Sequence, residues 1–405
     1  MSWNTLWQRF RARLSKGRRT PAERRPRLRP RLDTLEDRTV PSSYSVANAQ
    51  ELIVALGAAN LTPEADIITL AAGKTFILAA VNNTTDGATG LPVIASGEDL
   101  TIVGNGDTIE RSTAAGTPAF RHFDVAAGAS LTLLDLTLQG GLAFGSGTSA
   151  LGGAIYSQGA LEINGGRVQD NIAQGNAGGG YAAGGGIYSS GSLTLAGNAI
   201  IDHNQVHGGN GRPGGNAVGG GVFVGGGTVT LTNVVLSNNS AHGGNGYAGT
   251  PGGAGGNGGA GWGGALFVTG GSVTLTDDVL TNNAAVGGSG GQGGAGSIIG
   301  PRGQRNRGGA GGSGGNGAGG AVYVGGGAAT FLNDQVTYNS AVGGYAGAGG
   351  SGSPPHGASG QLGRGDGGGL YISAPACLNA FTVANVINNS TATSRPDIDG
   401  PYTLY

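Results

Sequence analysis

Six copies of one short pattern constrain this chain more than any other feature of its sequence. Each copy has two glycines, then glycine or alanine, an aliphatic residue and an aromatic ring, and an alternating β-prone run follows it and leads to an asparagine. The count from ring to asparagine is sixteen residues in four copies, fifteen in the first and eighteen in the last. The copies are Gly152–Tyr156, Gly184–Tyr188, Gly219–Phe223, Gly263–Phe267, Gly319–Tyr323 and Gly367–Tyr371.

The intervals between successive rings vary far more than this unit, at 32, 35, 44, 56 and 48 residues. A unit of fixed length with inserts at one corner is typical of a solenoid, in which each coil buries its apolar side only by stacking. Each unit holds three short β-rich runs. We therefore expect an all-β fold, a right-handed parallel β-helix (solenoid), with Gly-rich inserts at 208–218, 243–262, 287–318 and 343–366.

Stacking in register places equivalent residues above one another at about 4.8 Å. The aliphatic residue of each copy, from Ile155 to Leu370, is then expected in one internal column. Asn and Asp tolerate the left-handed backbone of tight corners, which predicts a structural ladder at the turn ten residues after each ring. The expected turn ladder is Asn198, Asn233, Asp277 and Asn333, and the closing asparagines Asn204, Asn239, Asn283 and Asn339 are expected to form a second ladder.

The conformation of the inserts is left open between two hypotheses. The chain contains 89 glycines, and residues 252–261 repeat glycine, glycine and a third residue. Gly-rich segments of this kind are either flexible or stacked on one another as extended polyglycine strands. A period of three suits the second hypothesis.

Residues ahead of the repeats divide into two further segments. Residues 1–41 are expected to be a mostly disordered export segment, 42–150 an N-terminal cap with the first coils, and 151–405 the Gly-rich repeats with the C-terminal end. Ala47–Asn60 reads as a short helix with Asn48 as N-cap and Glu51 three residues on. An open end of a repeat stack needs a cover, so this helix is the expected cap.

The charge of the chain is unevenly placed. Residues 1–41 carry a net charge of +8, and residues 42–405 carry −9. A nucleic-acid groove needs a basic stripe on the folded part, which the repeats lack, so we expect no nucleic-acid partner. Trp3, Trp7 and Phe10 lie on one face of a basic amphipathic helix, a pattern that predicts contact between the N-terminal segment and an anionic membrane.

Two resemblances bear on location. The segment that carries Leu35, Glu36, Arg38 and Pro41 resembles a sorting motif near the N-termini of large exported planctomycete proteins, which implies export. The Gly-Gly-x-aliphatic units with closing asparagines are similar to the repeats of polymorphic outer-membrane proteins. Together these resemblances imply a β-helix that is exported to the cell surface, to the outer membrane or to the extracellular space.

Two constellations are candidates for chemistry. Asp170 and Asp202 precede the closing asparagines of successive coils, and a separation of about 5 Å would suit a retaining glycosidase pair. His207 and His242 share a column beside Asp202, and such a group is a candidate metal site. The alternative for both is solvated polar residues at a corner, and we expect no cofactor.

The sequence therefore favours an exported structural or adhesive protein, with cell-envelope or extracellular polysaccharide as the partner. The alternative is a polysaccharide lyase or glycoside hydrolase of β-helix type. Lyases of this shape use a Ca²⁺ site built from several carboxylates and an Arg or Lys base, whereas galacturonase-like hydrolases carry Asn-Thr-Asp, Asp-Asp, His-Gly and Arg-x-Lys motifs. The repeats match only fragments of the hydrolase set. Asp277-Asp278 and His207-Gly208 are such fragments.

Overall fold

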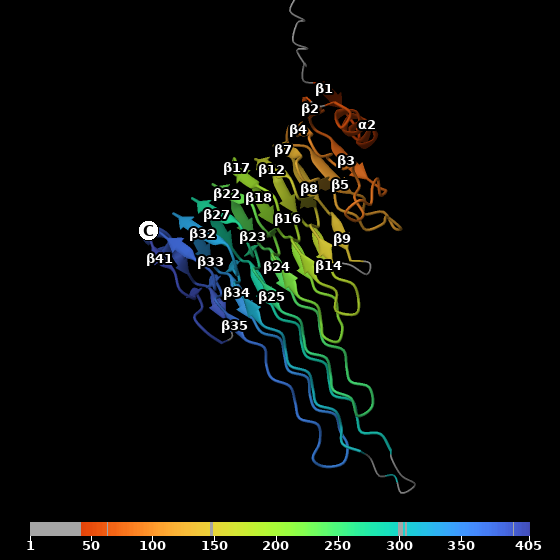
Figure 1. The fold of residues 1–405 in the computed structure, drawn as a ribbon, viewed down its shortest axis with the longest axis vertical. Helices are drawn as coiled ribbons and strands as arrows, with labels where there is room; N and C mark the ends of the chain where they lie inside the picture. Colours follow the sequence, from red (N-terminus) through yellow and green to blue (C-terminus); the bar gives the residue numbers. More distant parts are fainter. Residues whose placement is uncertain (1–41, 63, 146–148, 299–302, 304–305, 392) are drawn as a thin grey trace, which may run out of the picture. The chain divides into compact units, whose positions relative to one another are not determined.

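The described residues of the computed structural model form a right-handed parallel β-helix, which confirms the expected fold class. The structure describes residues 42–62, 64–145, 149–298, 303, 306–391 and 393–405. They belong to one compact unit, Pro41–Tyr405. Its strands lie in five sheets, named here I to V in the order in which one coil passes through them, and all the neighbouring strands of these sheets pair in parallel (Figure 1).

Sheets I, II and III form the three main walls of the coils. Sheet I contains β6 (Phe123–Val125), β11 (Ile155–Ser157), β16 (Ile187–Ser189), β21 (Val222–Val224), β26 (Leu266–Val268), β31 (Val322–Val324), β36 (Leu370–Ile372) and β40 (Ile398–Asp399). Sheet II contains β1 (Ser43–Val46), β2 (Ala65–Leu70), β4 (Asp99–Val103), β7 (Ser130–Leu134), β12 (Ala160–Asn164), β17 (Leu193–Ala196), β22 (Thr228–Thr232), β27 (Ser272–Thr276), β32 (Ala328–Leu332), β37 (Ala376–Leu378) and β41 (Thr403–Leu404). Sheet III contains β3 (Thr75–Leu78), β5 (Thr108–Arg111), β8 (Thr137–Gln139), β13 (Arg167–Gln169), β18 (Ile200–Asp202), β23 (Val235–Ser237), β28 (Val279–Thr281), β33 (Gln335–Thr337) and β38 (Val386–Ile387).

Sheets IV and V flank the inserts, and the expectation of three strands per unit missed them because their short strands carry mostly small residues and adjoin the Gly-rich inserts in the sequence. Sheet IV contains β9 (Leu142–Phe144), β14 (Ile172–Gln174), β19 (Gln205–His207), β24 (Ser240–His242), β29 (Ala284–Val286), β34 (Ser340–Val342) and β39 (Ser390–Thr391). Sheet V contains β10 (Ala150–Leu151), β15 (Ala182–Ala183), β20 (Ala217–Val218), β25 (Gly261–Trp262), β30 (Gly317–Ala318) and β35 (Gly365–Asp366).

Among the described residues, two helices depart from the coil pattern. Helix α2 (Ala49–Ala59) begins at Asn48, whose side chain accepts a hydrogen bond from the amide of Glu51, and it buries Leu52 and Leu56 at the start of the stack. This is the capping helix that the sequence predicts. Helix α3 (Ala380–Asn385) lies between β37 and β38, and it accounts for the two extra residues of the last unit.

The core narrows from the coils toward the inserts. Sheets I, II and III enclose Leu, Ile, Val and Phe side chains, such as Leu231 and Phe331, which are fully buried. Sheets IV and V lie closer together, and alanine predominates between them. At Gly261 an added Cβ would overlap the carbonyl oxygens of Val286 and Ala241. The buried, alanine-rich cluster between sheets IV and V consists of Ala143, Ala150, Ala173, Ala182, Val206, Ala217 and Ala241.

Beyond this alanine layer, the inserts form an ordered array in which neighbouring segments bond through their backbones (Figure 1). In residues 287–296, the second glycine of each triplet donates to the returning segment of the preceding insert at 2.8–2.9 Å. The first glycine donates at 2.8 Å to the next coil, either to the end of β34 or to the insert that follows it. The pairs are Gly288 to Gly259, Gly291 to Gly256, Gly294 to Gly253, Gly287 to Val342, Gly290 to Tyr345 and Gly293 to Ala348.

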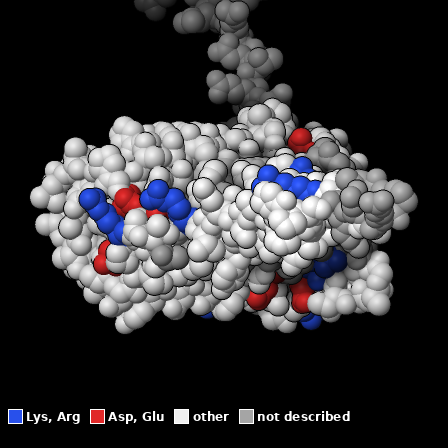
Figure 2. Space-filling view, turned by 90° about the horizontal axis from the view of Figure 1, so that it is seen from below, with Lys and Arg blue, Asp and Glu red and all other residues white. Residues whose placement is uncertain are grey.

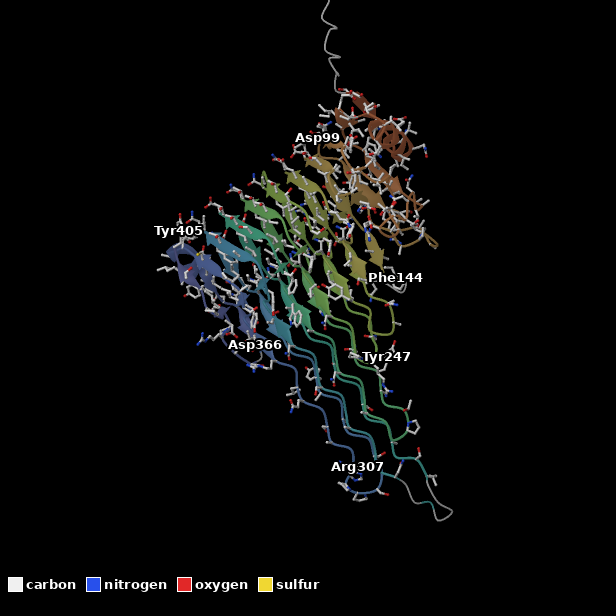
Figure 3. All side chains as sticks on the ribbon, viewed as in Figure 1. Asp99, Phe144, Tyr247, Arg307, Asp366 and Tyr405 are labelled. Carbon is white, nitrogen blue, oxygen red and sulfur yellow. The ribbon has the colours of Figure 1, made fainter. Side chains whose placement is uncertain are left out.

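This array decides between the two hypotheses for the inserts in favour of stacked extended strands. The hydrogen bonds repeat every three residues, which matches the three residues per turn of a polyproline II helix. Such a helix makes no internal backbone hydrogen bonds, so its amide and carbonyl groups can bond to neighbouring segments. A Cβ on Gly291 would overlap the carbonyl of Tyr247, and one on Gly312 would overlap that of Gly256. The third residue of each triplet is free of this constraint, and Figure 3 shows side chains crowding the coils and sparse along the inserts.

The predicted ladders occupy two corners of the coils. Asn198, Asn233, Asp277 and Asn333 all adopt a left-handed backbone, with φ between 55° and 63°. The closing asparagines are buried and bonded to one another. The side-chain oxygen of Asn239 accepts from both the backbone and the side chain of Asn204 at 3.0 Å, and its amide donates to Asn283 at 3.1 Å. The same pattern runs through Asn171, Asn204, Asn239, Asn283, Asn339 and Asn389.

Candidate functional site

A groove of about 500 Å³ follows the line where sheet IV passes into the inserts. Its first wall is the outward column of sheet IV, in which residues of five successive coils stand in register. Its second wall is the start of the inserts. The side chains that line it are Gln174, His207, Asn210, His242, Asn245, Val286, Ser289, Val342 and Tyr345.

The two histidines of the groove stack as a pair. Strand pairing places His207 beside His242, and their rings lie 5.5 Å apart at 18°. Burial lowers the pKa of both imidazoles, and the neighbouring His242 lowers that of His207 further. Both rings are therefore neutral at pH 7. His207 Nε2 lies 2.9 Å from Gln205 Oε1, whereas the ring of His242 has no hydrogen-bond partner among the described residues.

A second row of polar side chains lies on the insert side of the groove. Asn210 Oδ1 accepts from the amide of Asn245, and Asn245 Oδ1 accepts from the amide of Ser289, both at 2.8 Å. The two side-chain NH₂ groups make no bond to any residue that the structure describes. The groove thus presents unused neutral donors that repeat from coil to coil.

The far part of the groove is apolar. Val286 and Val342 continue the column that begins with Gln174 and the histidines. Tyr345 stands on the insert side with 78% of its surface exposed. The described residues that line the groove include no Asp, Glu, Lys or Arg, and Figure 2 shows only a few separate charged groups on the face seen from below.

The expected carboxylate pair does not share a column. Strand pairing places Asp202 opposite Gln169 and Ser237, so Asp170 is one residue out of register with Asp202. Asp202 accepts from Ser237 Oγ at 2.7 Å and from Asn238 Nδ2 at 3.0 Å. Burial opposes ionisation here, but these bonds and the neighbouring His203 leave the pKa of Asp202 below its usual value. This environment is typical of a bonded corner carboxylate.

The expected metal group is likewise divided. His207 and His242 line the groove from sheet IV, whereas Asp202 ends a strand of sheet III and pairs with His203 Nδ1 at 2.8 Å. Among the residues that the structure describes, no group of three or more His, Cys, Asp or Glu side chains is arranged to hold a metal ion.

Sequence reasoning missed a buried pair of acids. Asp278 accepts from the backbone amides of Val234 and Thr276, and its own amide donates to Asp334 at 3.0 Å. Both side chains are fully buried. Burial raises the pKa of Asp278 to about 7 and that of Asp334 to about 8. The only available signal was an Asp next to a turn residue, which does not reveal that the side chain points inward.

The repeated aromatic rings form a column outside the main core, with stacked centroids 4.6–5.7 Å apart from Tyr156 to Phe267. Phe223 and Phe267 are buried in it. Because their faces cover one another, these rings stabilise the stack and offer few open faces to a ligand.

Two predictions concern residues at the N-terminus. Leu35, Glu36, Arg38 and Pro41 of the sorting motif, and the amphipathic segment around Trp3, lie outside the described residues. Within the part of the chain that is described, no helix has the length and apolar character needed to span a membrane.

Comparison of the chain with protein-family models, with curated proteins and with solved structures gives no match.

Proposed function

We propose that this chain is an exported structural protein of the cell surface or extracellular space, and that its stacked coils and inserts form an adhesive surface for polysaccharide. The observation that carries the proposal is the glycine array. Loops that vary in length are the usual place for catalytic residues on a rigid scaffold. Here the variable segments are bonded to one another through their backbones, and they enlarge one continuous surface instead.

The export part of the proposal rests on two resemblances, to the planctomycete sorting motif and to the repeats of polymorphic outer-membrane proteins. Contact between the N-terminal segment and a membrane belongs to the same proposal. The register of Asp170 and Asp202 removes the main argument for the alternative, a lyase or hydrolase.

The test uses the full chain with insoluble cellulose, chitin and peptidoglycan, with and without Ca²⁺. Protein retained on the solid and sugar released from it are measured together. The proposal predicts retention without release. Release that the substitution Asp202→Asn abolishes would make the protein an enzyme, and the absence of both retention and release would contradict adhesion to these glycans.

A further inference from the structure

We propose that the groove between sheet IV and the inserts binds a linear neutral glycan that runs along the stack, across the strands. This inference rests on the proposed function and adds to it a site and a ligand class. The groove crosses five coils, and its volume of about 500 Å³ falls within the range of about 300–1,000 Å³ that is usual for ligand sites.

The charge of the lining selects a neutral ligand. An acidic polysaccharide or a nucleic acid would require Arg or Lys at the site, and neither is found among the described residues that line the groove. The neutral state of His207 and His242 is consistent with this selection, because a cationic imidazole pair would favour an anion.

Unused hydrogen-bond groups indicate a ligand rich in hydroxyl groups. The ring of His242, the NH₂ groups of Asn210 and Asn245, and the side-chain oxygen of Gln174 have no partner among the described residues. An imidazole donates at one nitrogen and accepts at the other, and an amide NH₂ donates. Such a mixture suits hydroxyl groups, which both donate and accept.

The geometry indicates an extended polymer. Equivalent groups repeat at the strand spacing of about 4.8 Å along the stack, so a ligand with repeating hydroxyl groups meets the same chemistry in each coil. At the apolar end, Val286, Val342 and the exposed ring of Tyr345 provide a surface for the C–H face of a sugar ring. The insert-side backbone amides are bonded to neighbouring inserts, so an added peptide strand finds few free partners.

The experiment titrates the full chain with cellohexaose, chitohexaose and mannohexaose by calorimetry, and with hexagalacturonate as the acidic counterpart. The key variants are His242→Phe, which removes the ring nitrogens and keeps the stack, and Tyr345→Ala. Phenylalanine is compatible with this column because Phe144 occupies the same column two coils earlier than His207 (Figure 3). His356→Phe and Tyr247→Ala are matched controls on inserts outside the lining.

We expect at least one neutral hexasaccharide to bind, the acidic one not to bind, and each key variant to weaken binding by about tenfold, while the controls stay within about twofold. Failure of all three neutral hexasaccharides to bind overturns the proposal. Unchanged affinity in both key variants also overturns it. If both key variants are retained on an insoluble glycan as well as the unmodified chain, the protein is adhesive but its binding surface lies outside this groove. If hexasaccharides bind in solution but the chain is not retained on insoluble glycan, the adhesive function is contradicted and the groove proposal stands.

Discussion

In the coils, large aliphatic side chains fill the interior, and the repeated aromatic rings of successive coils are 32 to 56 residues apart in sequence. In the inserts, hardly any side chain lies between neighbouring segments, and the backbones themselves are in contact. Both regions satisfy their amide and carbonyl groups through the coil above and the coil below. They differ in the source of stability, which is burial of apolar surface in the coils and backbone hydrogen bonding in the inserts.

This difference explains the composition of the chain. Glycine pays the largest entropic cost on ordering, so an isolated Gly-rich loop of this length remains disordered. The coils hold the two ends of each insert in register, and each insert then orders on its neighbour. The array therefore depends on the coils, whereas the coils contain a core of their own.

The largest effect is expected from a break in the asparagine ladder of the coils. Asn239→Ala leaves the amide and side chain of Asn204 and the carbonyl of Ile201 without their partner in a buried site. Each unsatisfied buried group costs about 1–3 kcal/mol. We expect unfolding in urea to show a loss of about 3–5 kcal/mol, with coils and inserts lost together. Thr230→Ala, on the outward side of sheet II, is the control and should be nearly neutral.

A smaller and local effect is expected from the array. In Gly291→Ala the new methyl group collides with the carbonyl of Tyr247, and overpacking of this kind costs about 1–3 kcal/mol. The amides of neighbouring inserts should lose protection from hydrogen exchange while those of the coils keep it. Gln292→Ala, at the adjacent exposed position, should leave both unchanged. Equal loss in the coils would show that the core depends on the array.

A third effect concerns pH. The folded-state pKa values of Asp278 and Asp334 are raised to about 7 and about 8 by burial, so the folded chain holds protons that the unfolded chain releases. Their contribution to stability is complete below about pH 4 and is lost as the pH rises through the folded values. We expect thermal stability to fall from pH 5 to pH 8, and Asp334→Asn to flatten this slope. Asp170→Asn, at an exposed corner of an earlier coil, should preserve the slope.

Much of the fold could be predicted from the constant number of residues in each repeat unit. When such units stack in register, equivalent residues of successive coils lie above one another in a column. Ile155, Ile187 and Val222 stand in register as predicted. The Gly-Gly-x period favoured extended inserts. The hydrogen bonds that keep the inserts ordered, however, join segments of different inserts, and the sequence of one insert does not reveal them.

The candidate site shows where spacing is insufficient. Asp170 lies one residue before Asn171, and Asp202 lies two residues before Asn204. A shift of one residue along a strand turns a side chain to the other face, so the two acids cannot be treated as equivalents. The groove could not be predicted because its second wall consists of insert residues, whose position relative to sheet IV depends on the ordered array.

The ordered array of inserts is tested most directly by hydrogen–deuterium exchange of the full chain, followed by mass spectrometry of peptides from residues 243–260 and 287–298 and from the coil strands. If the inserts form the bonded array, their glycine amides exchange far more slowly than in an unfolded chain, and this protection falls in Gly291→Ala. Exchange of the insert amides at the unfolded rate, beside protected coils, would contradict the ordered array and the adhesive surface inferred from it.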